Sequence, residues 1–190
     1  MTLNASVGQL RLLILASLFA ALTAAGAMIK IPVGIVPITL QTFVVYLAGL
    51  FLGGWGGCLS QLIYVLMGLI GIPVFSLGGG PAYILSPTFG YLVGFIFAAL
   101  ACGFLTEKGG IVWPLLGIIV AVVIIYACGV FYLYIHLAFI ARKAIPLMGV
   151  MKIGLFASLP LDSIKATLAL GIFYGARKRL RLPTGANNGG

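Results

Sequence analysis

Acidic side chains are almost absent from this sequence: Asp162 and Glu107 are the only two among 190 residues, and there is a single His. Catalysis by paired carboxylates, a metal cage of several histidines and a Ser-His-Asp triad all need more of these groups. The sequence also has no GxSxG or HExxH motif. We therefore expect that the chain is not an enzyme and that it holds no metal.

Charged residues of either sign are also scarce, at 7% of the chain, whereas soluble domains have about 25%. Hydrophobic residues make up 63%, and the mean hydropathy is +1.26. No soluble fold hides so much apolar surface. The formal net charge of +9 comes from 11 Lys and Arg that stand mainly at the ends of apolar stretches, unlike the basic face of a nucleic-acid binder. The lipid bilayer is therefore an expected partner, and nucleic acid is not.

Charge-free stretches long enough to cross a membrane fill most of the sequence. Crossing about 30 Å of hydrocarbon takes roughly 20 apolar residues, and clusters of glycine and proline divide the long uncharged segment 31–106. We predict an all-α integral membrane protein with one domain over residues 1–182 and a polar, flexible tail at 183–190. The six expected transmembrane helices span approximately 10–29, 38–53, 56–71, 87–106, 111–140 and 153–177.

Six helices place both termini on the same side of the membrane. The run Arg177-Lys178-Arg179-Leu180-Arg181 indicates that this side is cytoplasmic, because Lys and Arg near span ends are retained there. The expected location is the cytoplasmic membrane. On this topology the two long outer connections, 30–41 and 71–88, carry the polar side chains and indicate a lid over a site that opens outward.

Two charges, Asp162 and Lys165, stand inside the sixth expected helix and in its outer half. Each costs about 2.5 to 3.5 kcal/mol near the bilayer centre, so each requires a partner. Their spacing of three places them on one helix face, and Pro160 breaks the helix before them, which puts Asp162 in a positive first turn. The pair either neutralises itself and fixes packing or is bridged by a polar ligand. The convergence of the outer loops favours the ligand.

Several other polar and aromatic residues flank the outer loops. For Gln41, Tyr83 and Tyr91, a packing role and contact with a ring-containing ligand are equally expected. His136 is expected to be a packing residue. Aromatic residues typical of membrane-interface anchors are Trp55, Trp113, Tyr126, Tyr132 and Tyr134.

The first helix carries rows of small residues. Ala16, Ala20 and Ala24 follow each other at a spacing of four, with Ala21 and Ala25 beside them. Such rows let another helix approach closely. They fit either ordinary packing within the bundle or docking against a partner protein in the membrane.

Five motifs, in this order, together resemble the BioY family, the biotin-binding substrate-capture (S) components of energy-coupling factor (ECF) transporters. The likeness covers about residues 12–177. The motifs are Val36-Pro37-Ile38-Thr39-Leu40-Gln41-Thr42-Phe43, Leu47-Ala48-Gly49, Gly71-Ile72-Pro73-Val74-Phe75-Ser76 with Gly78-Gly79-Gly80, Pro87-Thr88-Phe89-Gly90-Tyr91-Leu92-Val93-Gly94-Phe95, and Pro160-Leu161-Asp162-Ser163-Ile164-Lys165-Ala166.

The resemblance implies an S-component fold of six helices with long outer loops 1 and 3, and a vitamin bound beneath them. It also implies partners: a transmembrane coupling protein that docks on the alanine rows, and two ATPase subunits whose ATP hydrolysis topples the S component. The sequence has no GxxxxGK[ST] phosphate loop. ATP is therefore expected to be used by the partner subunits, with no cofactor in this chain.

The polar groups of biotin match the residues that the family motifs supply. A buried Asp accepts from the ureido N–H groups, and Lys165 serves either the ureido oxygen or the carboxylate. Aromatic side chains pack on the rings, and loop glycines let the backbone close over the ligand. The expected binding residues are Asp162, Lys165, Gln41, Thr39, Phe75, Ser76, Gly79, Gly80, Tyr83 and Tyr91.

A second function in the same class stays open. The chain would then be a solitary biotin carrier or facilitator that works without the ATPase module. A homo-oligomer is a further option under either function. Uptake by liposomes that contain only this chain distinguishes the two functions.

Overall fold

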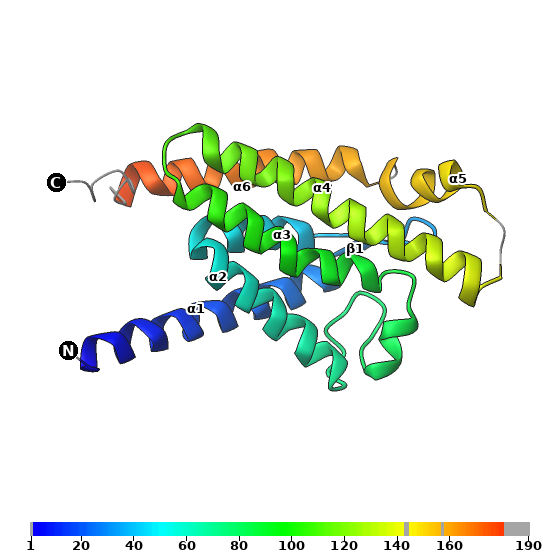
Figure 1. Cartoon of the computed structure of the whole chain (residues 1–190), viewed down its shortest axis with the longest axis horizontal. Coiled ribbons are helices and arrows are strands. Elements are labelled where there is room, and N and C mark those ends of the chain that lie inside the picture. Colours follow the sequence, from blue (N-terminus) through cyan, green and yellow to red (C-terminus); the bar gives the residue numbers. More distant parts are fainter. Residues whose placement is uncertain (1, 143–144, 157, 181–190) are drawn as a thin grey trace.

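The computed structural model describes residues 2–142, 145–156 and 158–180, so the predicted tail at 183–190 lies outside the described residues. It shows long helices packed side by side (Figure 1). The long helices are α1 (Thr2–Met28), α2 (Gln41–Leu69), α3 (Phe89–Glu107), α4 (Val112–Ile135) and α6 (Leu159–Leu180).

Helix α2 is interrupted at Gly53, whose φ of 74° and ψ of −174° are not helical. Side chains disfavour a positive φ, so glycine is the residue that suits this turn. The chain then folds back on itself, because a Cβ placed on Gly57 would lie 3.1 Å from the Cα of Gly49. The two arms of α2 run in opposite directions (Figure 1), and they cover the second and third helices that the sequence predicted.

Within the described residues, five ranges are long and apolar enough to cross a membrane, as expected of an integral membrane protein. They are Val7–Met28, Gln41–Leu69, Phe89–Glu107, Val112–Ile140 and Leu147–Arg179. Because the 29 residues of α2 are divided between two arms, each arm is shorter than the roughly 20 residues of a full span. The count of six crossings therefore stays a prediction.

Residues without large side chains let α2, α3 and α4 approach closely. A Cβ on Gly49 of α2 would lie 2.9 Å from the carbonyl oxygen of Ala99 on α3, and a Cβ on Gly117 of α4 would lie 2.9 Å from that of Cys102. Helix packing in membranes depends on such close contacts. The three helices thus form the closely packed part of the bundle.

The connection after α1 contains a short β-hairpin, which the sequence analysis missed. Strands β1 (Lys30–Ile31) and β2 (Ile38–Thr39) pair antiparallel, with Lys30 opposite Thr39. Gly34 takes a φ of +64° in the turn between them. Two-residue strands leave too little alternation to detect in the sequence, but their pairing satisfies backbone groups that would otherwise lack partners.

The connection between α4 and α6 is more helical than predicted. Helix α5 (Leu147–Met151) and the π-helical segment η3 (Lys152–Phe156) precede α6, and a second π-helical segment, η2 (His136–Ile140), follows α4. The expected start of the last helix at residue 153 is therefore wrong, because helical structure resumes directly after Pro146. The remaining short element is a 3-10 helix, η1 (Pro81–Leu85).

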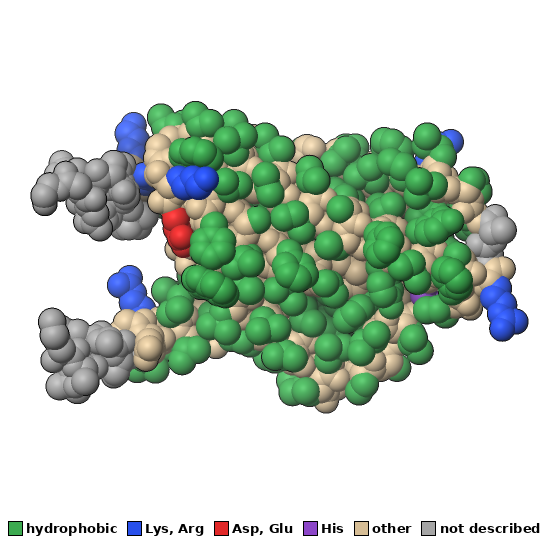
Figure 2. Space-filling model, viewed as in Figure 1, with side chains coloured by type: hydrophobic (Ala, Val, Ile, Leu, Met, Phe, Trp, Pro, Cys, Tyr) green, Lys and Arg blue, Asp and Glu red, His purple; other side chains and the backbone are tan. Residues whose placement is uncertain are grey.

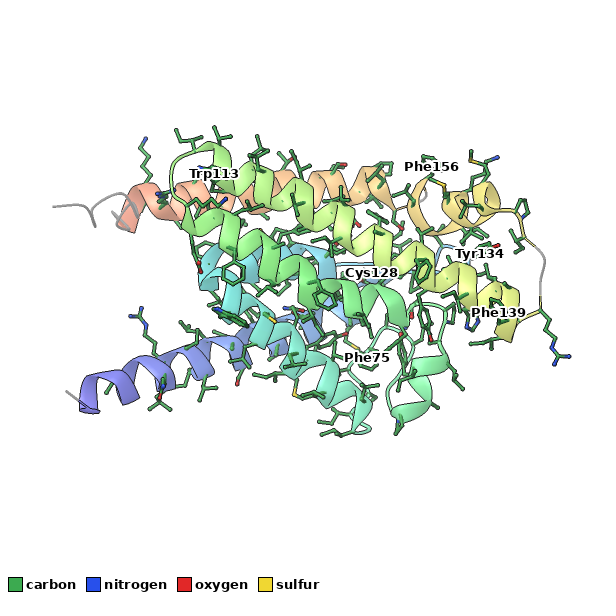
Figure 3. The ribbon with its side chains drawn as sticks, viewed as in Figure 1. Phe75, Trp113, Cys128, Tyr134, Phe139 and Phe156 are labelled. Atoms are coloured by element: carbon green, nitrogen blue, oxygen red, sulfur yellow. The ribbon has the colours of Figure 1, made fainter. Side chains whose placement is uncertain are left out.

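Lys and Arg side chains gather at the two ends of the molecule, with an apolar surface between them (Figure 2). This distribution is typical of a membrane-spanning bundle. The beginning of α1 and the end of α6 lie at the same end (Figure 1), with Trp113 toward that end and Phe139 at the opposite one (Figure 3). The assignment of the terminal end to the cytoplasm stays a prediction.

We predict that Gly103→Ala destabilises the bundle. A Cβ at Gly103 would collide with the backbone of Gly53 and Gly54 at the turn of α2, and overpacking of this kind costs about 1 to 3 kcal/mol. Thermal unfolding in detergent should show a lower Tm for this variant. Gly171→Ala is the matched control, because a Cβ there meets no atom within 4 Å and alanine favours a helix. Equal Tm values for the two variants would contradict the prediction.

Candidate ligand-binding site

The start of α6 places Asp162 in a helical first turn. The helix begins at Leu159, and Pro160 follows in its first turn, where the missing N–H costs nothing. The backbone N–H of Asp162 donates to the carbonyl of Ser158 at 3.0 Å. The predicted break near Pro160 is therefore confirmed, and the acidic side chain lies where the helix dipole favours a negative charge.

The carboxylate of Asp162 is buried, with 4% of the residue exposed, and it accepts hydrogen bonds from three side chains. The Thr42 hydroxyl on α2 donates to Oδ1 at 2.9 Å, and the Lys165 Nζ donates to the same oxygen at 2.6 Å. The Tyr126 hydroxyl on α4 donates to Oδ2 at 2.6 Å. Thr42 lies 120 positions from Asp162 in the sequence and Tyr126 lies 36 positions from it, so the fold brings distant residues together at one carboxylate.

Lys165 joins the same charge to the outer hairpin. Besides Asp162, its Nζ donates to the backbone carbonyl of Thr39 on β2 at 2.6 Å and lies 3.3 Å from the Thr42 hydroxyl. The two charged side chains form a direct ion pair. This is the arrangement expected if the pair neutralises itself and fixes helix packing. Asp162 nevertheless also lines a cavity, whereas Lys165 does not.

The cavity opens beneath the outer segments. Its volume is about 50 Å³. This volume is below the range of about 300 to 1,000 Å³ that is usual for small-molecule sites, so the cavity has to widen to admit a ring-containing ligand. Its lining residues are Val36, Pro37, Ile38, Thr39, Gln41, Ser76, Tyr83, Thr88, Tyr91, Leu92, Phe95, Ser158 and Asp162.

The structure brings six of the ten expected binding residues to the cavity wall. These are Thr39, Gln41, Ser76, Tyr83, Tyr91 and Asp162. The other four, Lys165, Phe75, Gly79 and Gly80, are not among its lining residues. Contact of any of the ten with a ligand stays a prediction.

Gln41 is held in place by hydrogen bonds on both sides of its amide. Its Nε2 donates to the Tyr64 hydroxyl at 2.5 Å, and its Oε1 accepts from the Thr39 hydroxyl at 2.8 Å. The Tyr64 hydroxyl donates onward to the carbonyl of Val74 at 3.2 Å. This chain links β2, the start of α2 and the 71–88 segment, and it fixes the orientation of the amide at the cavity wall.

Phe75 supports the aromatic part of the wall from behind. Its ring is 1% exposed and packs against Tyr64 and Tyr83, with ring centroids 5.4 Å and 4.5 Å apart. Gly68 of α2 leaves room for this ring, because any Cβ there would collide with it. Phe75 can be located in Figure 3. Tyr83, which faces the cavity, is fixed further by a 2.9 Å hydrogen bond between its hydroxyl and that of Thr88.

Gly79 and Gly80 serve the fold of the 71–88 segment itself. A Cβ on Gly79 would lie 2.9 Å from the carbonyl carbon of Ile72, so the two backbones touch only because no side chain intervenes. Gly80 takes a φ of +102° and donates its N–H to the carbonyl of Gly68 at 2.7 Å. Gly79 thus lets the segment fold closely on itself, and Gly80 ties the segment to the end of α2.

Tyr91 joins α3 to the η3 segment at the cavity wall. Its hydroxyl donates to the carbonyl of Gly154 at 2.8 Å, and its ring meets that of Tyr126 edge to face at 6.3 Å. Gly129 and Gly154 leave space for Tyr91, since a Cβ at either position would meet its side chain. Tyr91 thus positions the tyrosine that donates to Asp162.

A second lysine connects the two outer segments. The Nζ of Lys30 on β1 donates to the backbone carbonyl of Ser76 at 2.5 Å. Ser76 lines the cavity, and so do the residues of the hairpin that Lys30 begins. The hairpin and the 71–88 segment are therefore joined at the cavity mouth by one hydrogen bond from an exposed side chain.

The sequence analysis placed Tyr126 wrongly, as an interface anchor. The residue is 6% exposed, and its hydroxyl is bonded to the carboxylate of Asp162. A tyrosine within an apolar run looks the same in the sequence whether it anchors the membrane interface or donates to a buried carboxylate. Only the fold distinguishes these two roles. Thr42 and Thr88 were quoted only as parts of motifs, although each hydroxyl makes a buried hydrogen bond. Polar residues inside apolar spans were the signal that could have identified them.

The rows of alanines on α1 are divided between two faces. Ala16 and Ala20 are fully buried and Ala24 is partly buried, in the face of α1 that packs on α2. The expectation that Ala16 and Ala20 face a partner is therefore wrong, because they pack inside the chain. Ala21 and Ala25 are exposed and remain available for docking.

His136 lies at the junction of α4 and η2 and is partly buried. Its Nδ1 has no hydrogen-bond partner among the described residues. Within the same residues, no cluster of three or more His, Cys, Asp or Glu side chains could hold a metal ion.

Known proteins share the sequence pattern and the fold of this chain. The model of the BioY family matches residues 1–182. A probable biotin transporter BioY of Lysinibacillus sphaericus is 52% identical over 132 residues, which are 66% of this chain and 65% of the relative. The biotin transporter BioY of Thermotoga maritima is 42% identical over 173 residues, 89% of this chain and 97% of the relative.

The fold is similar to that of a solved structure described as the crystal structure at 2.1 Å of the S-component for biotin from an ECF-type ABC transporter. The TM-score is 0.79 at 27% sequence identity, and the match covers 97% of this chain and 96% of the other. The long apolar helices thus match an S-component fold. Sequence and fold agree, and the chain belongs to the BioY family.

Proposed function

We propose that this chain binds biotin and serves as the substrate-capture subunit of an ECF-type transporter. The observation that carries the proposal is a buried carboxylate, Asp162, at the wall of a cavity that opens beneath the outer segments. The relatives reported above are named biotin transporters. They agree with the expectation that the chain is not an enzyme.

The hydrogen-bonding capacity of Asp162 supports contact with the ureido ring. An ionised carboxylate has about four acceptor sites, and side chains of the protein donate three hydrogen bonds to it. A ureido N–H can take the remaining site without displacing a protein donor. We assign this contact to Asp162, with Lys165 holding the carboxylate in place and the aromatic rings of Tyr83 and Tyr91 packing on the ligand.

The distribution of basic residues supports a location in the cytoplasmic membrane. Arg177, Lys178 and Arg179 stand in the last turn of α6, at the same end as the start of α1 (Figure 1). Because Lys and Arg near span ends are retained inside, we place this end in the cytoplasm. The cavity then opens toward the outside, where the vitamin is captured.

Partner subunits complete the proposed transport cycle. We propose that a transmembrane coupling protein docks on α1 and that two ATPase subunits drive toppling of the whole chain. The exposed small residues Ala21 and Ala25 support this docking site, because they let another helix approach closely. The solitary carrier remains the alternative, and it needs neither subunit.

We predict that Asp162→Asn weakens biotin binding at least about tenfold, because an amide in place of the carboxylate removes the charge-assisted hydrogen bonds. Isothermal titration of the purified chain in detergent measures the dissociation constant. Glu107→Gln is the matched control: its Oε1 still accepts from the backbone N–H of Gly54, so affinity should not change. Unchanged affinity in Asp162→Asn, with an unchanged Tm, would remove this residue from the site.

We predict that Lys30→Met speeds biotin release. The variant loses the hydrogen bond to Ser76 that joins the outer segments, so the mouth opens more often, and the dissociation rate should rise about fivefold. Stopped-flow or surface-plasmon measurements on the purified chain give this rate. Arg142→Gln removes an exposed cation from the loop after η2 and should leave release unchanged. A wild-type rate in Lys30→Met would argue against this role.

We predict that Ala21→Trp blocks transport without weakening biotin binding. A bulky residue at this exposed position of α1 prevents close approach of the coupling protein. Uptake by liposomes that hold the complete complex should fall at least about tenfold, while titration with biotin should not change. Ile119→Trp, at an exposed position of α4, is the control. Wild-type uptake by liposomes that hold only this chain would favour the solitary carrier.

A further inference from the structure

A second hollow lies on the side of the molecule between α4 and the α5, η3 and α6 run. It is open to the outside and has a volume of about 530 Å³. We call it the lateral groove. Its lining residues are Val122, Val123, Tyr126, Ala127, Val130, Phe131, Leu147, Met151, Leu155 and Leu159. Val123, Phe131 and Leu147 are each more than half exposed at its rim.

The lining of the lateral groove is almost entirely apolar. Its walls come from two ranges that are apolar enough to cross a membrane, Val112–Ile140 and Leu147–Arg179. The only side-chain polar atom in its lining is the Tyr126 hydroxyl, which already donates to Asp162. Water needs two to four polar partners, and an empty groove forfeits dispersion contacts. In a bilayer, acyl chains are the material that fills such a space.

A transmembrane helix suits the groove less well than an acyl chain. Helices dock in membranes through Gly, Ala and Ser, because small residues let backbones approach. Here Ala127 is the one small residue in the lining, and the others are large aliphatic or aromatic side chains. A flexible chain fits between such side chains without a flat contact surface.

An exposed basic residue lies next to the groove lining in the sequence. Lys152 follows Met151 of the groove lining and is exposed. It is the first residue of η3, directly after α5, and α5 lies at the end of the molecule opposite the termini (Figure 1). A lysine ammonium at the membrane surface attracts a lipid phosphate. Groove and charge therefore match the two parts of one phospholipid.

The lateral groove and the ligand cavity share Tyr126. Its ring lines the groove, and its hydroxyl donates to Asp162, which lines the cavity. On its other side the ring meets Tyr91 edge to face. A chain in the groove would add the packing contacts that hold the ring in position, so lipid occupancy and the orientation of the carboxylate are coupled.

We propose that the lateral groove binds one acyl chain of a bilayer phospholipid, that Lys152 receives its phosphate, and that the bound chain holds Tyr126 against Asp162. The last part rests on the proposed function, because it concerns the carboxylate to which we assign biotin. The first two parts stand without it.

Lipid binding is tested by native mass spectrometry of the full chain, delipidated in a non-ionic detergent and titrated with palmitoyl-oleoyl phosphatidylglycerol. We expect one lipid per wild-type chain, about tenfold weaker binding in the groove-filling variants Ala127→Phe and Val123→Phe, and about threefold weaker binding in Lys152→Gln. Inorganic phosphate should not displace the lipid.

Two control variants should bind the lipid as the wild type does. Ala138→Phe makes the same exchange at an exposed alanine of η2, and Arg11→Gln removes a cation at the opposite end of the molecule. Equal retention of lipid by wild type and both groove-filling variants would overturn the site. A dimer trapped by a crosslink through Phe131→Cys would assign the groove to a second copy and overturn it as well.

The coupling is tested by titrating biotin with and without the lipid. Delipidated wild type should bind biotin about fivefold more weakly, and added lipid should restore its affinity. Tyr126→Phe should bind weakly in both conditions, because the hydroxyl that links groove and carboxylate is gone. Equal wild-type affinity with and without bound lipid would refute the coupling. Lipid binding without any biotin binding would instead refute the proposed function.

Discussion

The fold is organised around one buried charge. A carboxylate inside a membrane protein costs several kcal/mol unless it is paired and hydrogen-bonded, and Asp162 is 4% exposed. Its donors come from three helices: Thr42 on α2, Tyr126 on α4 and Lys165 on α6. Without any one of these donors, the carboxylate would have too few hydrogen-bond partners. The carboxylate therefore specifies how these three helices lie relative to one another. Packing between apolar surfaces alone would define their arrangement less sharply.

The same charge reaches the outer segments through Lys165. By donating to both Asp162 and the carbonyl of Thr39, the lysine holds β2 over the carboxylate. Lys30, which pairs with Thr39 across the hairpin, then reaches the carbonyl of Ser76 on the other side of the mouth. The floor and the mouth of the cavity thus belong to one network. A displacement of the carboxylate would therefore also displace the hairpin, because each link between them is a direct hydrogen bond or strand pair.

The parts of this arrangement that are local in sequence could be predicted. Charge-free stretches indicated the helices, glycine marked the turn at Gly53, and Pro160 marked the start of α6. Contacts between distant residues could not be predicted. Tyr126 looks like an interface anchor until α4 is placed beside α6, and the alanines of α1 look alike until α2 covers one face. Family motifs pointed to Asp162, whereas the groups that satisfy it appear only in the fold.

The two acidic residues show why position decides what a carboxylate can do. Glu107 is exposed at the end of α3 and accepts from the backbone N–H of Gly54, so it caps the second arm of α2 in contact with water. Asp162 is buried, and its carboxylate has unfilled acceptor capacity at the wall of the cavity. In the proposed complex that capacity attracts an N–H donor and repels an anion. We therefore expect the ureido ring of biotin, and not its carboxylate tail, to approach Asp162 in the proposed complex.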